Sequence, residues 1–328
     1  MKMTKINNKD RKDDLFGNRL FLFCQEHQLT LKGYKKVKNH VYVLDTDQGL
    51  KVLKSYRAKE KVEQIYQFLT NLHQQHFYQA VNYELFPSGE LLYKANDEDC
   101  YWTIQPYVKP NRKFTFKSKK DRNDAVLLLT QYHEQSRRMS KDNTYSFETY
   151  SLQQQWSRRL KTFESYAPRL TAYMSEQQVV NIINQGKQAL RYLKQYEVEE
   201  NALGQGIIHG DVASHNFIRN DAQTVMLIDF DLAAHVPIIY DYIQLAHRFL
   251  VYLNRSFVEV ESHHFFNYLV QNQFFLSSLL FPSHVVREWN RLLVNGMDAE
   301  KVHKLQVFTN ADMYYRQSFI ASILPKLS

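Results

Sequence analysis

The sequence predicts an α+β fold in two lobes, in which a small antiparallel sheet with one helix precedes a mostly helical lobe. Short β-prone runs with turn residues between them are concentrated before residue 106, whereas apolar residues at helical spacing dominate the rest. A chain of 328 residues is long enough for two lobes. We therefore expect one lobe over residues 1–105 and the other over residues 106–328.

The first lobe is expected to hold a short N-terminal helix, a sheet and a longer helix. Helical spacing of apolar residues predicts helices over residues 15–28 and 59–73. An Asp-, Gln- and Gly-containing turn over residues 45–49 lies between two apolar runs, which is typical of a hairpin. The predicted strands cover residues 42–44, 50–54, 90–93 and 101–104.

The second lobe is expected to be helical apart from a short central segment. Helices are predicted over residues 124–136, 153–163 and 179–196, and Gly204 and Gly206 then interrupt the helical pattern. From Asp241 onward the chain is predicted to form helices, with breaks at Pro282 and Gly296. The apolar stretch 274–281 is too short for a membrane span and is expected to be a core helix.

The most informative motif lies in that central segment. His209, Asp211 and Asn216 follow the spacing H-x-D-x-x-x-x-N, and Asp229 opens the later sequence D-F-D. Each of the two acids comes after a short apolar run, residues 206–208 and 225–228, which predicts a strand-turn-strand unit with one acid at the end of each strand. His209 is expected to brace the loop rather than to take part in chemistry.

These residue types match the requirements of phosphoryl transfer from ATP. The acceptor hydroxyl needs an acid within hydrogen-bond reach, which predicts Asp211 as the catalytic residue. Mg²⁺ prefers hard oxygen ligands and keeps several waters, which predicts Asn216 and Asp229 as metal ligands. The spacing is that of a kinase catalytic loop followed by its metal motif.

The first lobe supplies candidate nucleotide-binding residues. In strand 50–54 side chains alternate, so Val52 and Lys54 share one face and Lys51 points the other way. We expect Lys54 to bind the phosphates and Val52 to contact the adenine. The segment 105–108, which includes Gln105 and Tyr107, is expected to be a hinge whose backbone binds the adenine edge.

Two further features of this lobe bear on nucleotide binding. Glu60 and Glu63 on the predicted helix 59–73 are alternative partners for Lys54, and the sequence does not choose between them. Residues 36–41 occupy the place of a phosphate-binding loop but contain no glycine. The missing glycines argue against a protein kinase more than against the use of ATP.

The motif region resembles the protein-kinase-like superfamily in its small-molecule branch, which includes aminoglycoside phosphotransferases and choline kinases. Within that branch, L-I-D-F-D at 227–231 and I-Y-D-Y-I at 239–243 most resemble the CotS family of spore-coat-associated proteins. The resemblance is specific only over residues 206–248 and implies that Asp241 opens a helix, where an acid can cap it. It also implies an ATP site in the cleft between the lobes.

Composition sets the expected compartment and partners. Residues 1–14 are charged without an apolar core, and Cys24 and Cys100 are the only cysteines, so we expect a cytoplasmic protein without membrane association. The net charge is +8, and residues 109–122 carry seven basic residues against one acid. Because no nucleic-acid motif accompanies this run, we favour a solvated surface over a polyanion site and expect no nucleic-acid partner.

The resulting hypothesis is an ATP- and Mg²⁺-dependent phosphotransferase that acts on a hydroxyl of a small molecule. Acids are sparse from residue 258 to the C-terminus, which argues against an aminoglycoside acceptor. The resemblance also leaves open a spore-coat location with coat-protein partners, and the alternative of a non-enzymatic coat or scaffold protein with a kinase fold. Loss of Asp211, Asn216 or Asp229 would favour the scaffold, but all three are present.

Overall fold

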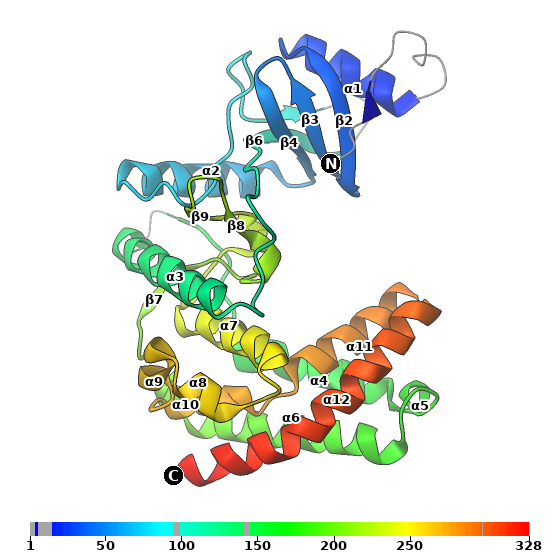
Figure 1. The fold of residues 1–328 in the computed structure, drawn as a ribbon, viewed down its shortest axis with the longest axis vertical. Helices are drawn as coiled ribbons and strands as arrows, with labels where there is room; N and C mark the ends of the chain where they lie inside the picture. Colours follow the sequence, from blue (N-terminus) through cyan, green and yellow to red (C-terminus); the bar gives the residue numbers. More distant parts are fainter. Residues whose placement is uncertain (1–3, 6–14, 95–98, 141–144, 297, 328) are drawn as a thin grey trace. The chain divides into compact units, whose positions relative to one another are not determined.

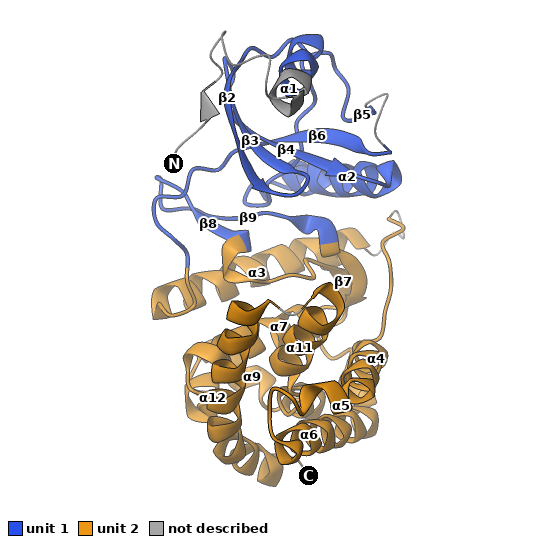
Figure 2. Ribbon diagram, turned by 90° about the vertical axis from the view of Figure 1, so that its right-hand side faces the viewer, with its two compact units in different colours: residues 1–114, 216–231 blue, residues 115–215, 232–328 orange. Residues whose placement is uncertain are grey.

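The structure, a computed structural model, describes residues 4–5, 15–94, 99–140, 145–296 and 298–327. The chain divides into two compact units, which Figure 2 distinguishes by colour. Unit 1 comprises Met1–Phe114 and Asn216–Asp231, and unit 2 comprises Thr115–His215 and Leu232–Ser328. Most of the segment 1–14, on which the expected absence of an export signal rests, lies outside the described residues. The functional lobes 1–105 and 106–328 stay a prediction.

Unit 1 is built on an antiparallel sheet of six strands in the order β1-β2-β3-β4-β6-β5 (Figure 1). The helix α1 (Leu15–Glu26) precedes most of the sheet, and α2 (Lys59–Gln74) follows β4. The strands are β1 (Thr4–Lys5), β2 (Leu31–Lys38), β3 (Val41–Thr46), β4 (Gly49–Tyr56), β5 (Tyr93–Lys94) and β6 (Tyr101–Pro106).

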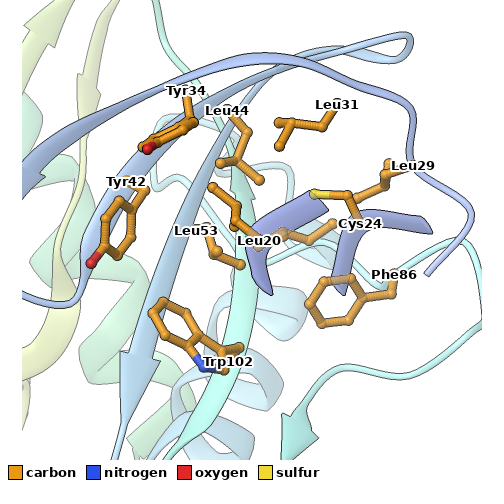
Figure 3. Packing of buried hydrophobic residues seen from close by; sticks show 11 residues of the cluster. Leu20, Cys24, Leu29, Leu31, Tyr34, Tyr42, Leu44, Leu53, Phe86 and Trp102 are labelled. Atoms are coloured by element: carbon orange, nitrogen blue, oxygen red, sulfur yellow. The ribbon is translucent and has the colours of Figure 1, made fainter. Parts of the chain in front are cut away.

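One face of this sheet packs on α1 to form a hydrophobic core. Leu20 and Cys24 of α1 meet Leu44, Leu53 and aromatic side chains of the strands (Figure 3). The alternation of side chains along β4 assigns Leu53 to this core and therefore Val52 and Lys54 to the opposite face. Burial raises the pKa of the Cys24 thiol to about 12, so this cysteine is an inert core residue.

A separate hairpin completes unit 1. Strand β8 (Phe217–Arg219) pairs antiparallel with β9 (Val225–Leu227). The backbone of Leu227 also exchanges hydrogen bonds with residues 79 and 81, just beyond α2, at 2.7 and 2.9 Å. Strand β9 is thereby tied to the segment that follows the helix, although it lies far along the sequence.

The predicted elements of unit 1 differ from the structure mainly in the strands. Strand β2 was not expected, because exposed lysines interrupt the apolar pattern that its buried Leu31 and Tyr34 provide. The strand predicted over residues 90–93 is reduced to β5, and β6 extends to Pro106. The predicted hinge 105–108 therefore begins inside a strand, where Gln105 pairs with Val52.

Unit 2 is mostly helical, as predicted (Figure 1). Helices α3 and α4 are longer than predicted at both ends, and α6 begins three residues earlier and ends one residue earlier, because apolar spacing locates a helix better than its ends. The helices are α3 (Lys119–Met139), α4 (Leu152–Ser165), α5 (Ala167–Leu170), α6 (Glu176–Gln195), α7 (Ile239–Tyr252), α8 (Phe257–Glu261), α9 (His264–Leu269), α10 (Gln273–Leu279), α11 (Ser283–Asn295) and α12 (Ala299–Ile323).

The central segment corrects the predicted strand-turn-strand unit. Strand β7 (Gln205–Ile208) pairs with β10 (Ala234–Pro237), whereas β9 pairs with β8. The two acids Asp211 and Asp229 thus follow strands of different two-stranded sheets in different units. Both runs are short and apolar, and such runs do not reveal which partner strand they choose.

The core of unit 2 contains a buried ion triad formed by Arg255, Asp312 and Arg316. Nε of Arg255 donates to Oδ1 of Asp312 at 2.6 Å, and Nε of Arg316 donates to Oδ2 at 2.9 Å. Burial would raise the pKa of Asp312, but the two arginines outweigh it and hold that pKa below its usual range. Within the described part of the chain, no helix is long and apolar enough to cross a membrane.

Candidate active site

Three of the predicted nucleotide-binding residues share one face of the sheet of unit 1. Val52 lies opposite Gln105 in the register of β4 and β6, and Lys54 lies opposite Thr103 two residues further on. Directly opposed residues of antiparallel strands project to the same face, so Val52, Gln105 and Lys54 form one row. Tyr107 follows β6, and its N–H donates to the carbonyl of Leu50 at 3.2 Å.

The predicted metal ligands lie side by side at the open end of the β8–β9 hairpin. Asn216 immediately precedes β8, and Ile228, which follows β9, donates its N–H to the Asn216 carbonyl at 3.0 Å. Asp229 therefore comes next to Asn216, although Asp229 is thirteen positions later. Asp229 adopts φ of +68°, a left-handed conformation that is strained for a non-glycine residue and is concentrated at functional sites.

Lys54 links the sheet face to this hairpin. Its Nζ lies 2.6 Å from Oδ1 of Asp229 and 2.7 Å from Oδ2 of Asp231. The Lys54 residue is 8% exposed, so both ion pairs are shielded from water and stronger than surface pairs. The structure thus brings Lys54 and Asp229 into direct contact.

Asp231 is held in turn by a pair of tyrosines. The Tyr56 hydroxyl donates to Oδ1 of Asp231 at 2.8 Å and lies 2.8 Å from the hydroxyl of Tyr83. Burial, the neighbouring tyrosine and the Asp231 carboxylate raise the pKa of Tyr56, so it stays a neutral hydrogen-bond donor. Asp231 therefore keeps a fixed orientation toward Lys54.

Neither helix glutamate proposed as a partner of Lys54 takes that role. Glu60 and Glu63 are exposed on α2, and Glu63 lies 3.9 Å from Lys59 as an exposed i,i+4 pair. Lys51, on the opposite face of β4, pairs with Glu84 at 2.6 Å. The two lysines of this strand thus bind different acids on different faces, as the alternation predicts.

The glycine-free segment 36–41 forms the β2–β3 hairpin. His40 supplies the positive φ of +64° that the turn requires, where a glycine is the usual choice. Lys38 at the end of β2 places its Nζ 3.8 Å from Oδ2 of Asp229 and is largely exposed. A flexible cation next to the predicted metal ligand Asp229 could contact a phosphate group, as the backbone amides of glycine-rich loops do in other proteins.

In unit 2 the His209-Gly210-Asp211 loop is held by the carboxylate of Asp241. Oδ2 of Asp241 accepts from the N–H of His209 at 2.8 Å, and Oδ1 accepts from the N–H of Gly210 at 2.9 Å. The ring Nε2 of His133 donates to Oδ2 at 2.9 Å, and Asp241 is fully buried. Asp241 lies in the first turn of α7 but braces this loop instead of capping its own helix, which corrects the capping role expected for it.

Each residue of the loop has a separate structural task. The ring Nδ1 of His209 accepts from the N–H of Asp211 at 3.2 Å, which supports the bracing role predicted for this histidine. Gly210 has φ of +81°, and a Cβ at this position would lie 2.0 Å from the carbonyl oxygen of Leu232, so only glycine fits. His133, which contacts the buried side of this loop through Asp241, is a structural histidine.

Arg248 is a site residue that the motif did not reveal. Its Nη2 donates to Oδ1 of Asp211 at 2.9 Å, and both side chains are partly exposed. Arg248 comes seven residues after Asp241 in α7, a spacing that places both on one face of a helix and is the only sequence signal for it. Asp231, Tyr56 and Tyr83 were likewise missed, because their roles depend on contacts between distant segments.

The donor set fits the cofactors expected from the motif. The amide oxygen of Asn216 and the carboxylate of Asp229 are hard oxygen donors of the kind Mg²⁺ prefers, and Lys54 and Lys38 supply cations for phosphates. Asn216 is buried and Asp229 is partly exposed, so at least one of the two expected metal ligands is accessible from solvent.

Comparison with known proteins identifies the family. The chain matches the model of the phosphotransferase enzyme family over residues 31–271, which is most of its length. No curated protein gives a significant match.

Solved structures support the same fold. An aminoglycoside phosphotransferase from Alicyclobacillus acidocaldarius is 16% identical with a TM-score of 0.70, over 90% of this chain and 92% of that one. A microcompartment-associated aminopropanol kinase is 14% identical with a TM-score of 0.64, over 95% and 100%. A choline kinase from Cryptosporidium parvum is 10% identical with a TM-score of 0.58, over 95% and 98%.

The predicted kinase-like fold is confirmed by these matches, as is the broad aminoglycoside phosphotransferase and choline kinase branch. At such low identity the solved structures establish the fold, whereas the family match covers the motifs described above. The chain belongs to the phosphotransferase enzyme family.

Proposed function

We propose that the protein transfers the γ-phosphoryl group of ATP, in the presence of Mg²⁺, to a hydroxyl of a small molecule. The observation that carries this proposal is the cluster at the open end of the β8–β9 hairpin, where buried Lys54 contacts Asp229 and Asn216 lies alongside. A buried lysine, a carboxylate in a strained conformation and an amide are what phosphate and metal binding require.

In this proposal each residue of the site has a distinct role. Lys54 holds the phosphates, Asn216 and Asp229 hold the metal, and Val52 and Gln105 line the sheet face next to Lys54 for the base. Mg²⁺ held by Asn216 and Asp229 would supply positive charge that offsets the charge of the phosphates during transfer. Asp211 accepts the proton of the acceptor hydroxyl through one carboxylate oxygen while Arg248 holds the other.

The nucleotide is the first matter to test. Structures of a similar spectinomycin phosphotransferase contain ADP or AMP, whereas those of a similar aminoglycoside 2'-phosphotransferase contain GDP. We favour ATP for this chain and expect ATP with Mg²⁺ to raise the melting temperature more than GTP does. A ligand at a hundred times its Kd stabilises the folded state by about 2.7 kcal/mol.

Asp229→Asn tests the metal role. The variant should lose most of the melting shift caused by ATP and Mg²⁺, because an amide replaces the charged ligand. Asp221→Asn is the matched control, since Asp221 lies in the exposed turn of the same hairpin and pairs only weakly with Lys109, at 3.4 Å. An equal shift in wild type and Asp229→Asn would remove Asp229 from the metal site.

Asp211→Asn separates an enzyme from a scaffold. This change should leave ATP binding nearly intact and lower turnover by about 10²–10⁴-fold, the usual contribution of general-base catalysis. Identical residual ATP hydrolysis in wild type and variant, with every acceptor tried, would favour the alternative of a non-enzymatic protein with a kinase fold.

We further propose that the protein belongs to the CotS group and is associated with the spore coat. Both points rest on the sequence similarity at residues 227–243, where Asp229, Asp231 and Asp241 all have structural roles. Fractionation of sporulating cells of the source organism tests this proposal. Recovery of the protein with the coat layers would support it, and its confinement to the cytosol would contradict it.

A further inference from the structure

A cavity of about 40 Å³ lies in unit 2, between the start of α3, the C-terminal end of α7 and the α8–α9 segment. A single water needs about 10–15 Å³, so the space suits a group of a few non-hydrogen atoms. Its apolar wall includes Phe249 and Phe266, whose ring centroids are 5.8 Å apart. Its polar wall is formed by the side chains of Lys119, Arg122, Glu259, Ser262 and His263.

Arg122 is held in place with one side of its guanidinium group unused. The residue is 9% exposed, and its Nη1 donates to the carbonyls of Phe116 and Lys117 at 2.8 and 3.1 Å. Across the residues that the structure describes, the Arg122 side chain forms no ion pair and no other hydrogen bond. Its Nε–H and Nη2–H therefore stay available. In a guanidinium group these two bonds point the same way and form a fork that matches two oxygens of a carboxylate or a phosphate.

The charges of the cavity wall are not balanced within the wall itself. Lys119 is exposed and has no acidic partner among the described residues, whereas Lys120 next to it pairs with Asp124 at 3.2 Å. Burial lowers the pKa of Arg122, and the charge of Glu259 counters this only in part. Two cations thus face one carboxylate among the described residues of the wall. Both cations lie at the start of α3, beside the positive end of the helix dipole, where an anion is favoured.

His263 adds two ring nitrogens that no protein group satisfies. Within the described ranges, neither Nδ1 nor Nε2 has a hydrogen-bond partner, and both are screened from solvent. Burial, and then the charges of Arg122, His264 and Lys119, lower the pKa of His263, so its ring is neutral at pH 7 and carries one N–H donor. A buried donor usually has a partner, either in the protein or in a bound water or ion. Because the His263 ring lines the cavity, a group bound there is a candidate partner.

We propose that this cavity binds an oxyanion, the phosphate or carboxylate group of a small molecule, with the Arg122 fork as its main anchor and Lys119 as the second cation. The residues of the cavity wall are different from those of the candidate active site. The inference therefore does not depend on the proposed phosphotransferase activity. It also gives two residues of the basic run 109–122 a role that a solvated surface does not explain.

The experiment uses inorganic phosphate and acetate as probes on the full chain without nucleotide, with chloride at equal ionic strength as the reference. Titration calorimetry and the melting temperature are measured with each salt. Phosphate or acetate should bind saturably and raise the melting temperature more than chloride does, because a ligand of the folded state stabilises it. The probe with the lower Kd distinguishes a phosphate from a carboxylate. Equal shifts with all three salts would reflect only screening of the net charge of +8 and would overturn the proposal.

Arg122→Lys and Lys119→Gln test the two cations. Arg122→Lys keeps the charge and a donor for the backbone carbonyls but loses the fork, so the Kd of the preferred anion should rise at least about tenfold. Lys119→Gln should raise this Kd about twofold to fivefold, since an exposed charge contributes less. Lys117→Gln is the matched control, because Lys117 is an exposed lysine of the same basic run that does not line the cavity. Its Kd should equal that of wild type, and an effect as large as that of Lys119→Gln would contradict the proposal.

Two further variants distinguish this cavity from other places where an anion could bind. If Lys54→Met abolishes phosphate binding while Arg122→Lys leaves it intact, phosphate occupies the proposed nucleotide site and the inference fails. Glu259→Gln removes the like charge from the cavity wall and should lower the Kd of the anion, whereas a Kd that does not fall would exclude an anionic occupant. Glu259 and Lys119 are both exposed, so these two variants decide the question even if Arg122→Lys fails to fold.

Discussion

Replacing Asp241 by asparagine tests how the catalytic loop is held. The carboxylate accepts three hydrogen bonds, from the backbone N–H groups of His209 and Gly210 and from the ring of His133, at 2.8–2.9 Å. Asn has one accepting oxygen and one NH₂ group, so at least one of the three donors must face another donor. The loop that carries Asp211 would lose part of its anchor.

The expected cost follows from these contacts. A hydrogen bond to a charged group contributes about 1.5–3 kcal/mol, and a buried donor left without a partner costs about 1–3 kcal/mol. Because Asp241 is fully buried, water cannot replace the lost partner. We expect Asp241→Asn to lower the free energy of unfolding by about 3–5 kcal/mol, which corresponds to a fall in melting temperature on the order of 10 °C.

The assay combines thermal unfolding with turnover measured well below the melting temperature. Turnover should fall at least about tenfold while ATP binding persists, since a misplaced general base costs rate rather than nucleotide affinity. Asp312→Asn is the control, because it also removes a buried carboxylate charge of unit 2 but acts on the ion triad. A melting temperature of Asp241→Asn within 2 °C of wild type would refute the anchoring role, because such a shift corresponds to a loss of about 1 kcal/mol of unfolding free energy at most.

Three further outcomes are expected. Lys54→Met should raise the Kd of ATP at least about tenfold, because the variant loses a charged contact with the phosphates. Lys51→Met, on the opposite face of β4, should change this Kd less than about twofold. If titration calorimetry shows the larger effect for Lys51→Met, the assignment of the two lysines is reversed. Gly210→Ala should lower the free energy of unfolding by at least about 1–3 kcal/mol, because alanine is strained at this positive φ. The new Cβ would also overlap the carbonyl of Leu232. An unchanged melting temperature would contradict this expectation. His247 has a pKa lowered to about 3 by burial and by nearby arginines. Only the unfolded chain takes up this proton as the pH falls below about 6.5, so lowering the pH from 7 to 5 should cost about 2 kcal/mol of stability. In His247→Gln, the free energy of unfolding measured with denaturant should change less between pH 7 and pH 5 than in wild type. An equal change in both proteins would show that His247 is not the source of the pH dependence.

The motif residues could be predicted from sequence because their spacing reflects local loop geometry. Asp211, Asn216 and Asp229 are tied to short loops next to apolar runs, and Lys54 could be assigned by side-chain alternation alone. The roles of these residues in binding and catalysis stay predictions that the variants above test. The kinase-like fold followed from the same motifs together with helical spacing in the second half of the chain.

The rest depends on contacts that no local pattern encodes. Strand β7 pairs with β10 rather than with the strand before Asp229. This pairing could not be predicted, because the sequence of a short apolar run does not indicate which strand it pairs with. Arg248 was missed because an arginine on a helix normally signals a solvated face. Only the folded structure shows that the Arg248 guanidinium donates to Asp211.

The acid at position 231 explains why Lys54 has no glutamate partner on α2. The third residue of the metal motif is Asp231, where a glycine often stands, and it lies 2.7 Å from Lys54 with Tyr56 holding its other oxygen. Lys54 is thus oriented from the loop side, and α2 need not supply a glutamate, which leaves Glu60 and Glu63 in solvent. Asp229, the other acid on Lys54, is 24% exposed in its side chain. If Asp229 binds Mg²⁺ as proposed, Asp231 can still keep the lysine in place.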